Sequence, residues 1–199
     1  MTTSPPSSST IGWVAIATGV SVILAIVLFI LMYTVDMFFG KINDVFNSII
    51  GILSAILAWM LYIKHHSKTP LISQIAFLLA VVGALFTIVG SILIIFDFTG
   101  FLLAGWYSGV GNALIGLWLM AFCYWLLRNN SLPRNLVIFG TITGIFMAIG
   151  LLGIPAIFAR IDSMRSMPWY LYLALFGWFG TYVLYPIWTL WLGRNLILR

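Results

Sequence analysis

Six long apolar stretches dominate this chain of 199 residues and constrain its fold more than any other feature. A helix needs about 20 apolar residues to cross the hydrocarbon core of a bilayer, and about 18 suffice to mark a candidate. The connections between the stretches are short. The pattern therefore predicts an all-α, polytopic integral membrane bundle of six transmembrane helices, at Ile11–Val35, Val45–Ile63, Leu71–Phe96, Phe101–Leu127, Asn135–Phe158 and Trp169–Leu192.

The composition supports the same class. Hydrophobic residues make up 63% of the chain and charged residues 7%, whereas about 25% of the residues in a soluble domain are charged. We expect residues 11–199 to form a single six-helix domain. Residues 1–10 are rich in serine, threonine and proline and contain no cation, which predicts a disordered polar tail and not a cleaved signal peptide.

The cations predict an orientation. With an even number of spans, both termini lie on one side, and that side carries six Lys and Arg against three on the other. Because cations are retained in the cytoplasm, we expect cytoplasmic termini and a location in the plasma or inner membrane. The net charge of +5 favours anionic inner-leaflet lipids as partners and not nucleic acid. The termini side carries Lys64, Lys68, Arg128, Arg134, Arg194 and Arg199, and the other side Lys41, Arg160 and Arg165.

Three aspartates, Asp36, Asp97 and Asp162, end the first, third and fifth stretches. A helix C-terminus disfavours an acid, so capping does not explain them. They either form turns and pair with nearby cations, or build an outer acidic cluster that binds a cation or an amine. Asp44 instead precedes a stretch and is predicted to cap its N-terminus.

An internal repeat links two asparagines. Residues 40–51 align without gaps with residues 105–116, which places Asn47 on Asn112, and the same offset places Asp97 on Asp162. The repeat predicts three helical hairpins with their tips outside. We expect Asn47, Asp97, Asn112 and Asp162 to line an outward-facing ligand cavity. The alternative for the asparagines is hydrogen bonding between helices.

Glycines, prolines and aromatics add packing signals. Gly105/Gly109 and Gly140/Gly144 have the GxxxG spacing that lets helices approach closely. Pro155 and Pro186 should kink the fifth and sixth spans. Several aromatics fall on one face of the sixth span, where they either wall a cavity or pack and contact lipid: Tyr172, Trp178, Tyr182 and Tyr185.

The histidines and the cysteine of the chain are not arranged in a pattern that indicates an enzyme. The two histidines, His65 and His66, fall in a predicted basic loop, and Cys123 is the single cysteine. This argues against a haem, a zinc protease or a disulfide redox centre, and no nucleotide-binding fingerprint occurs. We predict no catalytic site, no metal site and no cofactor.

One part of the chain resembles a known family. Ala113–Trp118, Trp125–Arg134 and Gly140–Gly144 are similar to a family of bacterial multi-pass membrane proteins known only as a domain of unknown function, and Tyr185–Gly193 is similar in style. In that family a long apolar helix turns at a Ser-x-Leu-Pro-Lys/Arg step into a glycine-rich helix. The resemblance implies a fold neighbourhood and no activity.

Two functions remain open from the sequence. The first is binding or transport of a small solute or lipid through the outward-facing cavity, and six short-looped spans also resemble the substrate-binding subunits of vitamin uptake transporters. The second is a structural or accessory subunit that docks through its glycine faces onto a larger membrane complex.

Overall fold

The computed structural model describes residues 6–65, 70–129 and 131–198. These residues contain six helical spans, each long and apolar enough to cross a membrane, so the predicted all-α six-helix class is confirmed. The first four spans are single helices: α1 (Ser8–Thr34), α2 (Phe38–His65), α3 (Pro70–Ile95) and α4 (Phe101–Asn129).

The last two spans are interrupted helices. The fifth is α5 (Arg134–Ala148), a 3-10 segment η2 (Ile149–Gly153) and α6 (Ile154–Phe158); a loop with a 3-10 turn, η3 (Met164–Ser166), follows it. The sixth is α7 (Leu171–Ala174), α8 (Phe176–Phe179), a π-helical segment η4 (Gly180–Leu184) and α9 (Tyr185–Ile197).

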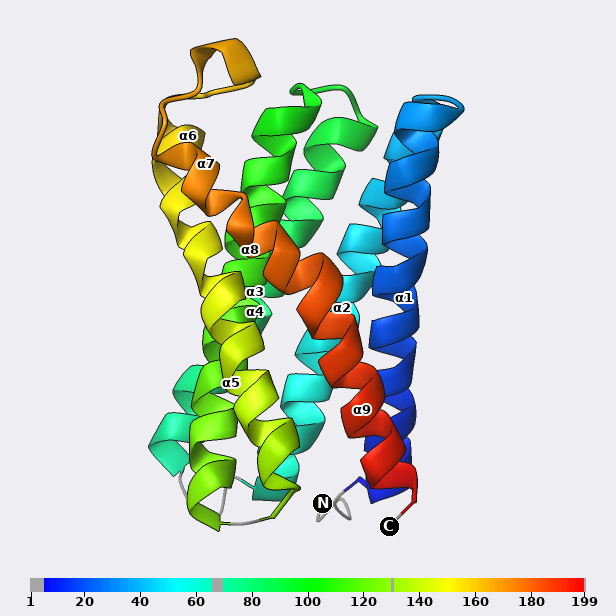
Figure 1. Ribbon diagram of the computed structural model, residues 1–199, viewed down its shortest axis with the longest axis vertical. Coiled ribbons are helices and arrows are strands. Elements are labelled where there is room, and N and C mark those ends of the chain that lie inside the picture. Colours follow the sequence, from blue (N-terminus) through cyan, green and yellow to red (C-terminus); the bar gives the residue numbers. More distant parts are fainter. Residues whose placement is uncertain (1–5, 66–69, 130, 199) are drawn as a thin grey trace.

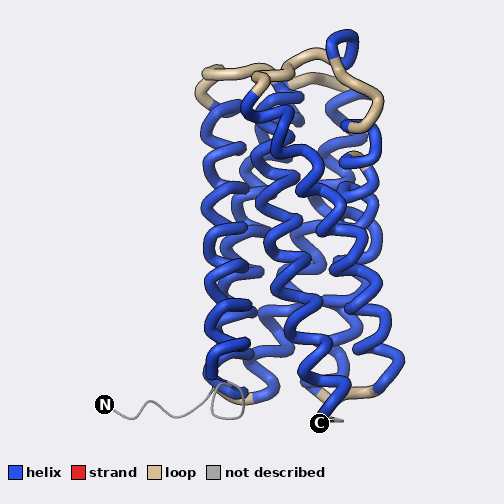
Figure 2. Tube along the Cα trace, turned by 90° about the vertical axis from the view of Figure 1, so that its left-hand side faces the viewer, coloured by secondary structure: helices blue, strands red, loops and turns tan. Residues whose placement is uncertain are grey.

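The spans form a closed ring, and α4 is the member of the ring that lies deepest in the bundle. Each span packs against the next one along the chain, and α9 packs back on α1. The first five spans run along the long axis, the sixth (α7 to α9) crosses the bundle obliquely, and both termini lie at the same end (Figures 1 and 2). In α4, 67% of the membrane-length window is buried, against 33–44% in the other spans. The interior helix is therefore α4, which also contacts α2 across the bundle.

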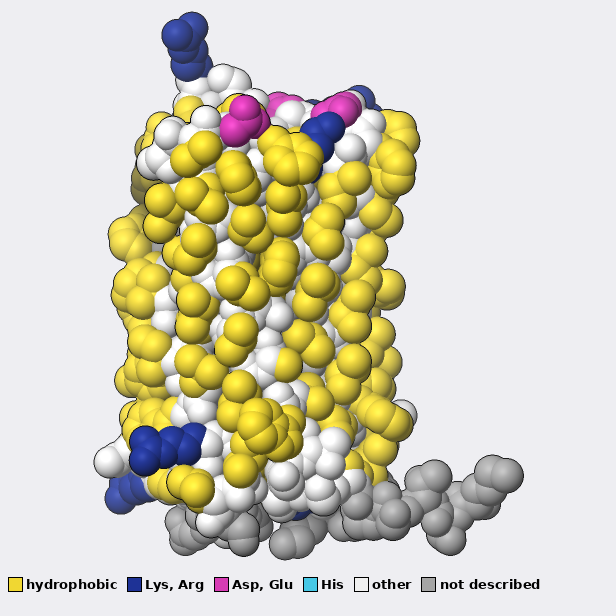
Figure 3. Space-filling view, turned by 90° about the vertical axis from the view of Figure 1, so that its right-hand side faces the viewer, with side chains coloured by type: hydrophobic (Ala, Val, Ile, Leu, Met, Phe, Trp, Pro, Cys, Tyr) yellow, Lys and Arg dark blue, Asp and Glu magenta, His cyan; other side chains and the backbone are white. Residues whose placement is uncertain are grey.

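The outer surface is that of a membrane protein. On the face drawn in Figure 3, hydrophobic side chains cover the middle of the bundle and charged side chains gather at its two ends. The acidic side chains lie at the end away from the termini. This distribution matches a hydrocarbon core between two polar interfaces. The chain is thus a multi-pass helical membrane protein.

Reciprocal glycine pairs allow three of the helix crossings. A Cβ atom at Gly111 would lie 2.5 Å from the backbone oxygen of Gly83, and a Cβ at Gly83 would lie 2.5 Å from the oxygen of Gly111. At such a contact the two helix backbones lie so close that there is no room for a side chain at either glycine. The three crossings are Gly83–Gly111 (α3/α4), Gly116–Gly144 (α4/α5) and Gly12–Gly193 (α1/α9).

At both prolines where a kink is predicted, the helix type changes in the preceding turn. Pro155 and Pro186 occupy the first turn of α6 and α9, where a missing N–H group is tolerated. The preceding turns, η2 and η4, leave the α geometry. A π segment inside an α-helix is uncommon and often marks a functional position.

Two helix starts differ from the prediction. The Ser7 hydroxyl accepts a hydrogen bond from the Thr10 N–H, and α1 begins at Ser8, so the helix includes the end of the predicted polar tail; residues 1–5 of that tail lie outside the described residues. α2 begins at Phe38, whose N–H donates to Asp36 over 2.7 Å. The predicted capping role of Asp44 is wrong, because Asp44 lies inside α2.

Candidate functional site

Asp36 and Asp97 hold turns at the end of the bundle away from the termini. Asp36 accepts the hydrogen bond from Phe38 at the start of α2. Asp97 has a left-handed backbone (φ 57°), and its carboxylate accepts a 2.8 Å hydrogen bond from the Lys41 ammonium group. The Lys41 and Asp97 side chains are 46% and 72% exposed. Asp36 and Asp97 therefore have the structural role that the sequence left open: they form turns, and Asp97 pairs with a nearby cation.

Asp162 caps a helix from a distant loop. Its two carboxylate oxygens accept hydrogen bonds from the backbone N–H groups of Gly100 (2.6 Å) and Leu103 (3.0 Å), at the start of α4. A carboxylate is favourable there because it pairs orphan donors and faces the positive end of the helix dipole. Asp162 therefore fixes the third hairpin tip to the second.

A cluster of polar side chains lies one to three turns inside α2. Asn43, Asp44 and Asn47 are 1%, 6% and 5% exposed, and their spacing places them on one face of the helix. The Asn43 amide donates to the backbone oxygen of Ala25 in α1 over 2.6 Å. The Asn47 amide donates to Oδ1 of Asn43 (3.1 Å) and, at a longer 3.4 Å, to Oδ1 of Asp44. The cluster faces the bundle interior.

Two other spans hold this cluster in place. The Tyr182 hydroxyl, in η4, donates to Oδ1 of Asn47 over 2.9 Å. The Ser91 hydroxyl, in α3, donates to the backbone oxygen of Asp44 over 2.5 Å. The asparagine alternative of hydrogen bonds between helices therefore applies to Asn47.

The cluster faces α4 across a small cavity, which we call the Asp44 pocket. Its volume is about 20 Å³, and about 10–15 Å³ is the space that one water molecule needs. The pocket is a junction of α1, α2, α4 and the sixth span. Its lining residues are Phe29, Asn43, Asp44, Asn47, Phe101, Gly105, Ser108, Gly109, Asn112, Trp178 and Tyr182.

Three residues that line the Asp44 pocket each carry an unpaired oxygen atom. Oδ2 of Asp44, Oγ of Ser108 and Oδ1 of Asn112 are buried and find no hydrogen-bond partner among the described residues. Each unpaired buried group costs about 1–3 kcal/mol. Because three residues with such an atom line one cavity, the Asp44 pocket is the candidate functional site.

Only part of the predicted site is assembled here. Asn47 and Asn112 line the Asp44 pocket together, as the repeat predicts, while Asp97 and Asp162 lie outside its lining. Gly105 also lines it, and a Cβ atom there would lie 3.4 Å from the Trp178 ring. The glycine spacing of α4 thus leaves room for an aromatic wall.

The aromatic residues of the sixth span divide between the two alternatives. Trp178 and Tyr182 line the Asp44 pocket. Tyr185 is buried in the core and hydrogen-bonds Ser54 over 2.9 Å, whereas Tyr172 is 48% exposed on the outer surface. Half of this face therefore walls a cavity and half serves packing or lipid contact.

Sequence reasoning missed Asn43, Asp44 and Ser108. The apolar stretch begins at Val45, which predicts that Asp44 lies at a helix end. The signal that identifies it is the i, i+1, i+4 spacing of three polar side chains, which is a single inward face if the helix begins earlier. Ser108 stands opposite Asn43 in the 65-residue repeat.

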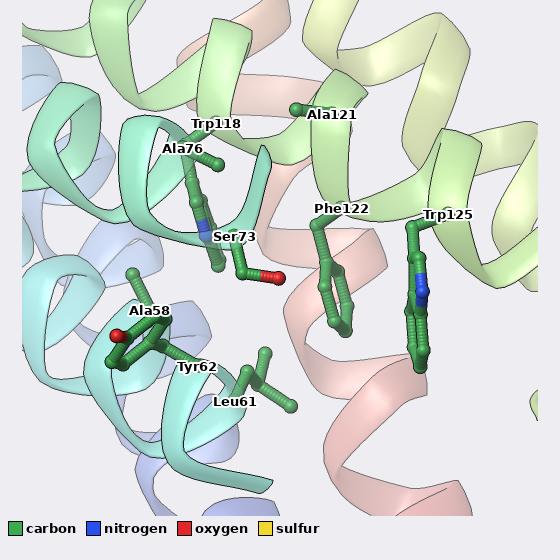
Figure 4. A pocket seen from close by; sticks show the side chains of 9 residues that line it. All are labelled: Ala58, Leu61, Tyr62, Ser73, Ala76, Trp118, Ala121, Phe122 and Trp125. Atoms are coloured by element: carbon green, nitrogen blue, oxygen red, sulfur yellow. The ribbon is translucent and has the colours of Figure 1, made fainter. Parts of the chain in front are cut away.

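A second cavity, near the other end of the bundle, is apolar. Side chains of α2, α3 and α4 surround it, and the Ser73 hydroxyl is directed into the space between them (Figure 4). Its volume is about 20 Å³, and Trp118 and Phe122 stack on one side of it with ring centres 6.0 Å apart. It is a packing void between aromatic side chains.

The fold and the Asp44 pocket define a multi-pass helical membrane protein with a polar site inside the bundle. Neither a model of a known protein family, nor a curated protein, nor a solved structure matches the chain. The predicted kinship with uncharacterised bacterial membrane proteins stays a prediction.

Proposed function

We propose that this membrane protein binds a small polar solute in the Asp44 pocket and carries it across the membrane. The observation that supports this most is the set of unpaired buried oxygens on Asp44, Ser108 and Asn112. Buried polar atoms are nearly always hydrogen-bonded, because leaving them unpaired costs free energy. A pocket of about 20 Å³ suits a very small solute.

The interrupted sixth span supports transport. Trp178 of α8 and Tyr182 of η4 form one wall of the pocket. Discontinuous helices frame the substrate sites of many transporters, where irregular backbone lies next to the bound ligand. Movement of the sixth span about η4 is the step that we propose opens the pocket.

We also propose a non-catalytic role. The functional groups that line the Asp44 pocket are one carboxylate, three amides, a serine hydroxyl, a tyrosine hydroxyl and the indole N–H group of Trp178. Histidine and cysteine, the commonest general base and an intrinsically strong nucleophile, are not among these lining residues. The groups suit recognition by charge and hydrogen bonds.

The second candidate, an accessory subunit, has less support. The accessory-subunit hypothesis predicts docking through the GxxxG glycines. These glycines instead pack against other helices of the same chain: Gly144 crosses Gly116, and Gly140 faces the Trp188 ring and Cys123. Gly105 and Gly109 face Trp178. A partner subunit would therefore need a different surface.

We propose that the end with both termini faces the cytoplasm of a plasma or inner membrane, next to anionic lipids, which makes the Asp44 pocket outward-facing. The distribution of cations supports this through the positive-inside rule. Single cysteines at Asn129 and Ser163, in a Cys123→Ala background, test it. On intact cells an impermeant maleimide should label only the Ser163→Cys protein, and labelling of Asn129→Cys instead would reverse the orientation.

A ligand screen tests the proposed function. The thermal unfolding midpoint of the purified protein in detergent is measured with a panel of small polar solutes and inorganic salts. At least one should raise the midpoint of the wild type, since a ligand stabilises the state that binds it, and Asn112→Leu should lose that effect. Asn195→Leu, the same change at a half-buried amide of α9 outside the pocket, is the control. If no compound separates the wild type from Asn112→Leu, the proposal fails.

A further inference from the structure

We infer that the ligand of the Asp44 pocket is a monovalent inorganic cation of the sodium class, held by Asp44, Ser108 and Asn112. This inference rests on the proposed function, because it names the ligand of the same pocket. Four properties of the pocket lead to this inference: a buried carboxylate without a partner, the oxygen atoms that could bind a cation, the net charge of the occupied site, and the size of the pocket.

The first property is an uncompensated carboxylate. The Asp44 side chain is 6% exposed, and among the described residues the only ion pair is Lys41–Asp97 at the bundle end. An ionised carboxylate buried without a partner is very costly. The Asn47 amide offers Oδ1 of Asp44 one long hydrogen bond of 3.4 Å, and Oδ2 has none. A positive charge beside Oδ2 removes most of this cost.

The second property is the chemistry of the free donor atoms. The unpaired atoms are a carboxylate, a hydroxyl and an amide oxygen, and hard cations are bound by oxygen ligands of these kinds. They come from two different helices, α2 and α4, which meet only inside the bundle. A cation at this point therefore receives one charged ligand from one helix and two neutral ligands from the other.

The third property is charge balance. The pocket lining contains one acid and no Lys or Arg, so a monovalent cation makes the site neutral. A divalent cation would leave one net positive charge in a medium of low dielectric constant.

The fourth property is size. The pocket holds about 20 Å³, roughly the space of a single water molecule. A desolvated alkali cation meets this limit, whereas an amine with a carbon skeleton exceeds it. The amine alternative raised by the outer aspartates therefore does not fit this pocket.

The test measures thermal unfolding in detergent while NaCl replaces choline chloride at constant ionic strength. The wild-type midpoint should rise with Na⁺ and saturate, and Asp44→Asn should abolish the rise. Asp97→Asn, which removes an exposed carboxylate outside the pocket, is the matched control and should keep the wild-type response. Li⁺, K⁺ and Mg²⁺ series establish the selectivity, with Mg²⁺ expected to have no saturable effect.

Ser108→Ala and Asn112→Leu keep the inference testable if Asp44→Asn does not fold. Each should shift the half-saturating Na⁺ concentration upward by about tenfold or more, which is the effect of losing one contact to a charged group. An equal Na⁺ response in wild type and Asp44→Asn would overturn the inference. The inference would also be overturned if the unfolding midpoint of the wild type changed with pH but with no alkali cation, since Asp44 would then bind only a proton.

The two proposals fail separately. If an uncharged solute stabilises the wild type through Asn112 and no cation does, the proposed function stands and the cation inference is wrong. If neither solutes nor cations distinguish the pocket variants from the wild type, both are wrong.

Discussion

The Tyr182 hydroxyl donates a 2.9 Å hydrogen bond to Oδ1 of Asn47 and so joins the sixth span to the second across 135 positions of the chain. Both residues line the Asp44 pocket, and Asn47 also donates to Asn43. The bond therefore connects the π-helical segment η4 directly to the polar cluster of α2. Opening the pocket by a movement of η4 would break this hydrogen bond.

Tyr182→Phe should destabilise the protein. It removes the donor to Asn47 and leaves a buried amide oxygen unpaired, at a cost of about 1–3 kcal/mol. The measurement is the thermal unfolding midpoint in detergent, which should fall. Tyr172→Phe, at an exposed position of the same span, should leave the midpoint unchanged. Equal midpoints for the two variants would contradict a structural role of the Tyr182 bond.

Gly109→Ala and Gly111→Ala should have opposite effects although they are two residues apart in α4. A Cβ at Gly111 would lie 2.5 Å from the Gly83 oxygen, so the α3/α4 crossing must open, at about 1–3 kcal/mol. A Cβ at Gly109 would meet the Trp178 ring at an ordinary 3.4 Å, and alanine favours the helix by up to about 1 kcal/mol. Unfolding midpoints should therefore fall for Gly111→Ala and hold or rise for Gly109→Ala.

Gly109→Ala should also weaken ligand binding. Gly109 lines the Asp44 pocket, and an added methyl group takes up part of a cavity of about 20 Å³. The ligand-induced rise in midpoint should shrink although the protein itself is no less stable. An undiminished rise would place the ligand elsewhere.

Asp162 should matter more for stability than Asp97. Asp162→Ala removes the cap on α4 and should cost about 0.5–2 kcal/mol, whereas Asp162→Asn keeps an accepting oxygen and should cost less. Asp97→Asn removes an exposed ion pair, worth about 0–1 kcal/mol, and asparagine tolerates the left-handed backbone there. Chemical unfolding in mixed detergent gives the ranking, and a larger loss for Asp97→Asn than for Asp162→Ala would reverse it.

Cys123 should resist thiol reagents in the folded protein. Its side chain has no exposed surface, and buried structural cysteines are inert. A maleimide should label the wild type only after denaturation, and an added cysteine at exposed Ser163 should react at once. Labelling of native wild type would show that α4 is solvated at this depth.

The class of fold and two residues of the Asp44 pocket can be predicted from the sequence. Apolar length alone predicts the spans, because a bilayer sets that length. Asn47 and Asn112 were found through the repeat, which survives in the structure as two equivalent positions facing one cavity. The π segment η4 was not foreseen, since Pro186 predicts an interruption and not its type.

The roles of the aspartates depended on distant partners. Lys41 lies 56 positions from Asp97, and Gly100 lies 62 positions from Asp162. A single sequence does not show which of several loop cations or helix starts an acid will meet. Asp36 and Asp44 both precede an apolar run, and only the backbone of α2 decides that Asp36 begins the helix and Asp44 enters the interior.

The closing contact between α1 and α9 has a consequence for biosynthesis. Gly12 and Gly193 approach each other from the two ends of the chain, and both helices stand side by side in Figure 1. Synthesis delivers N-terminal segments first, so the Gly12 face of α1 is in contact with lipid or with the insertion machinery while the other spans are made. The Gly12 face of α1 therefore meets its partner helix only after α9 has been synthesised.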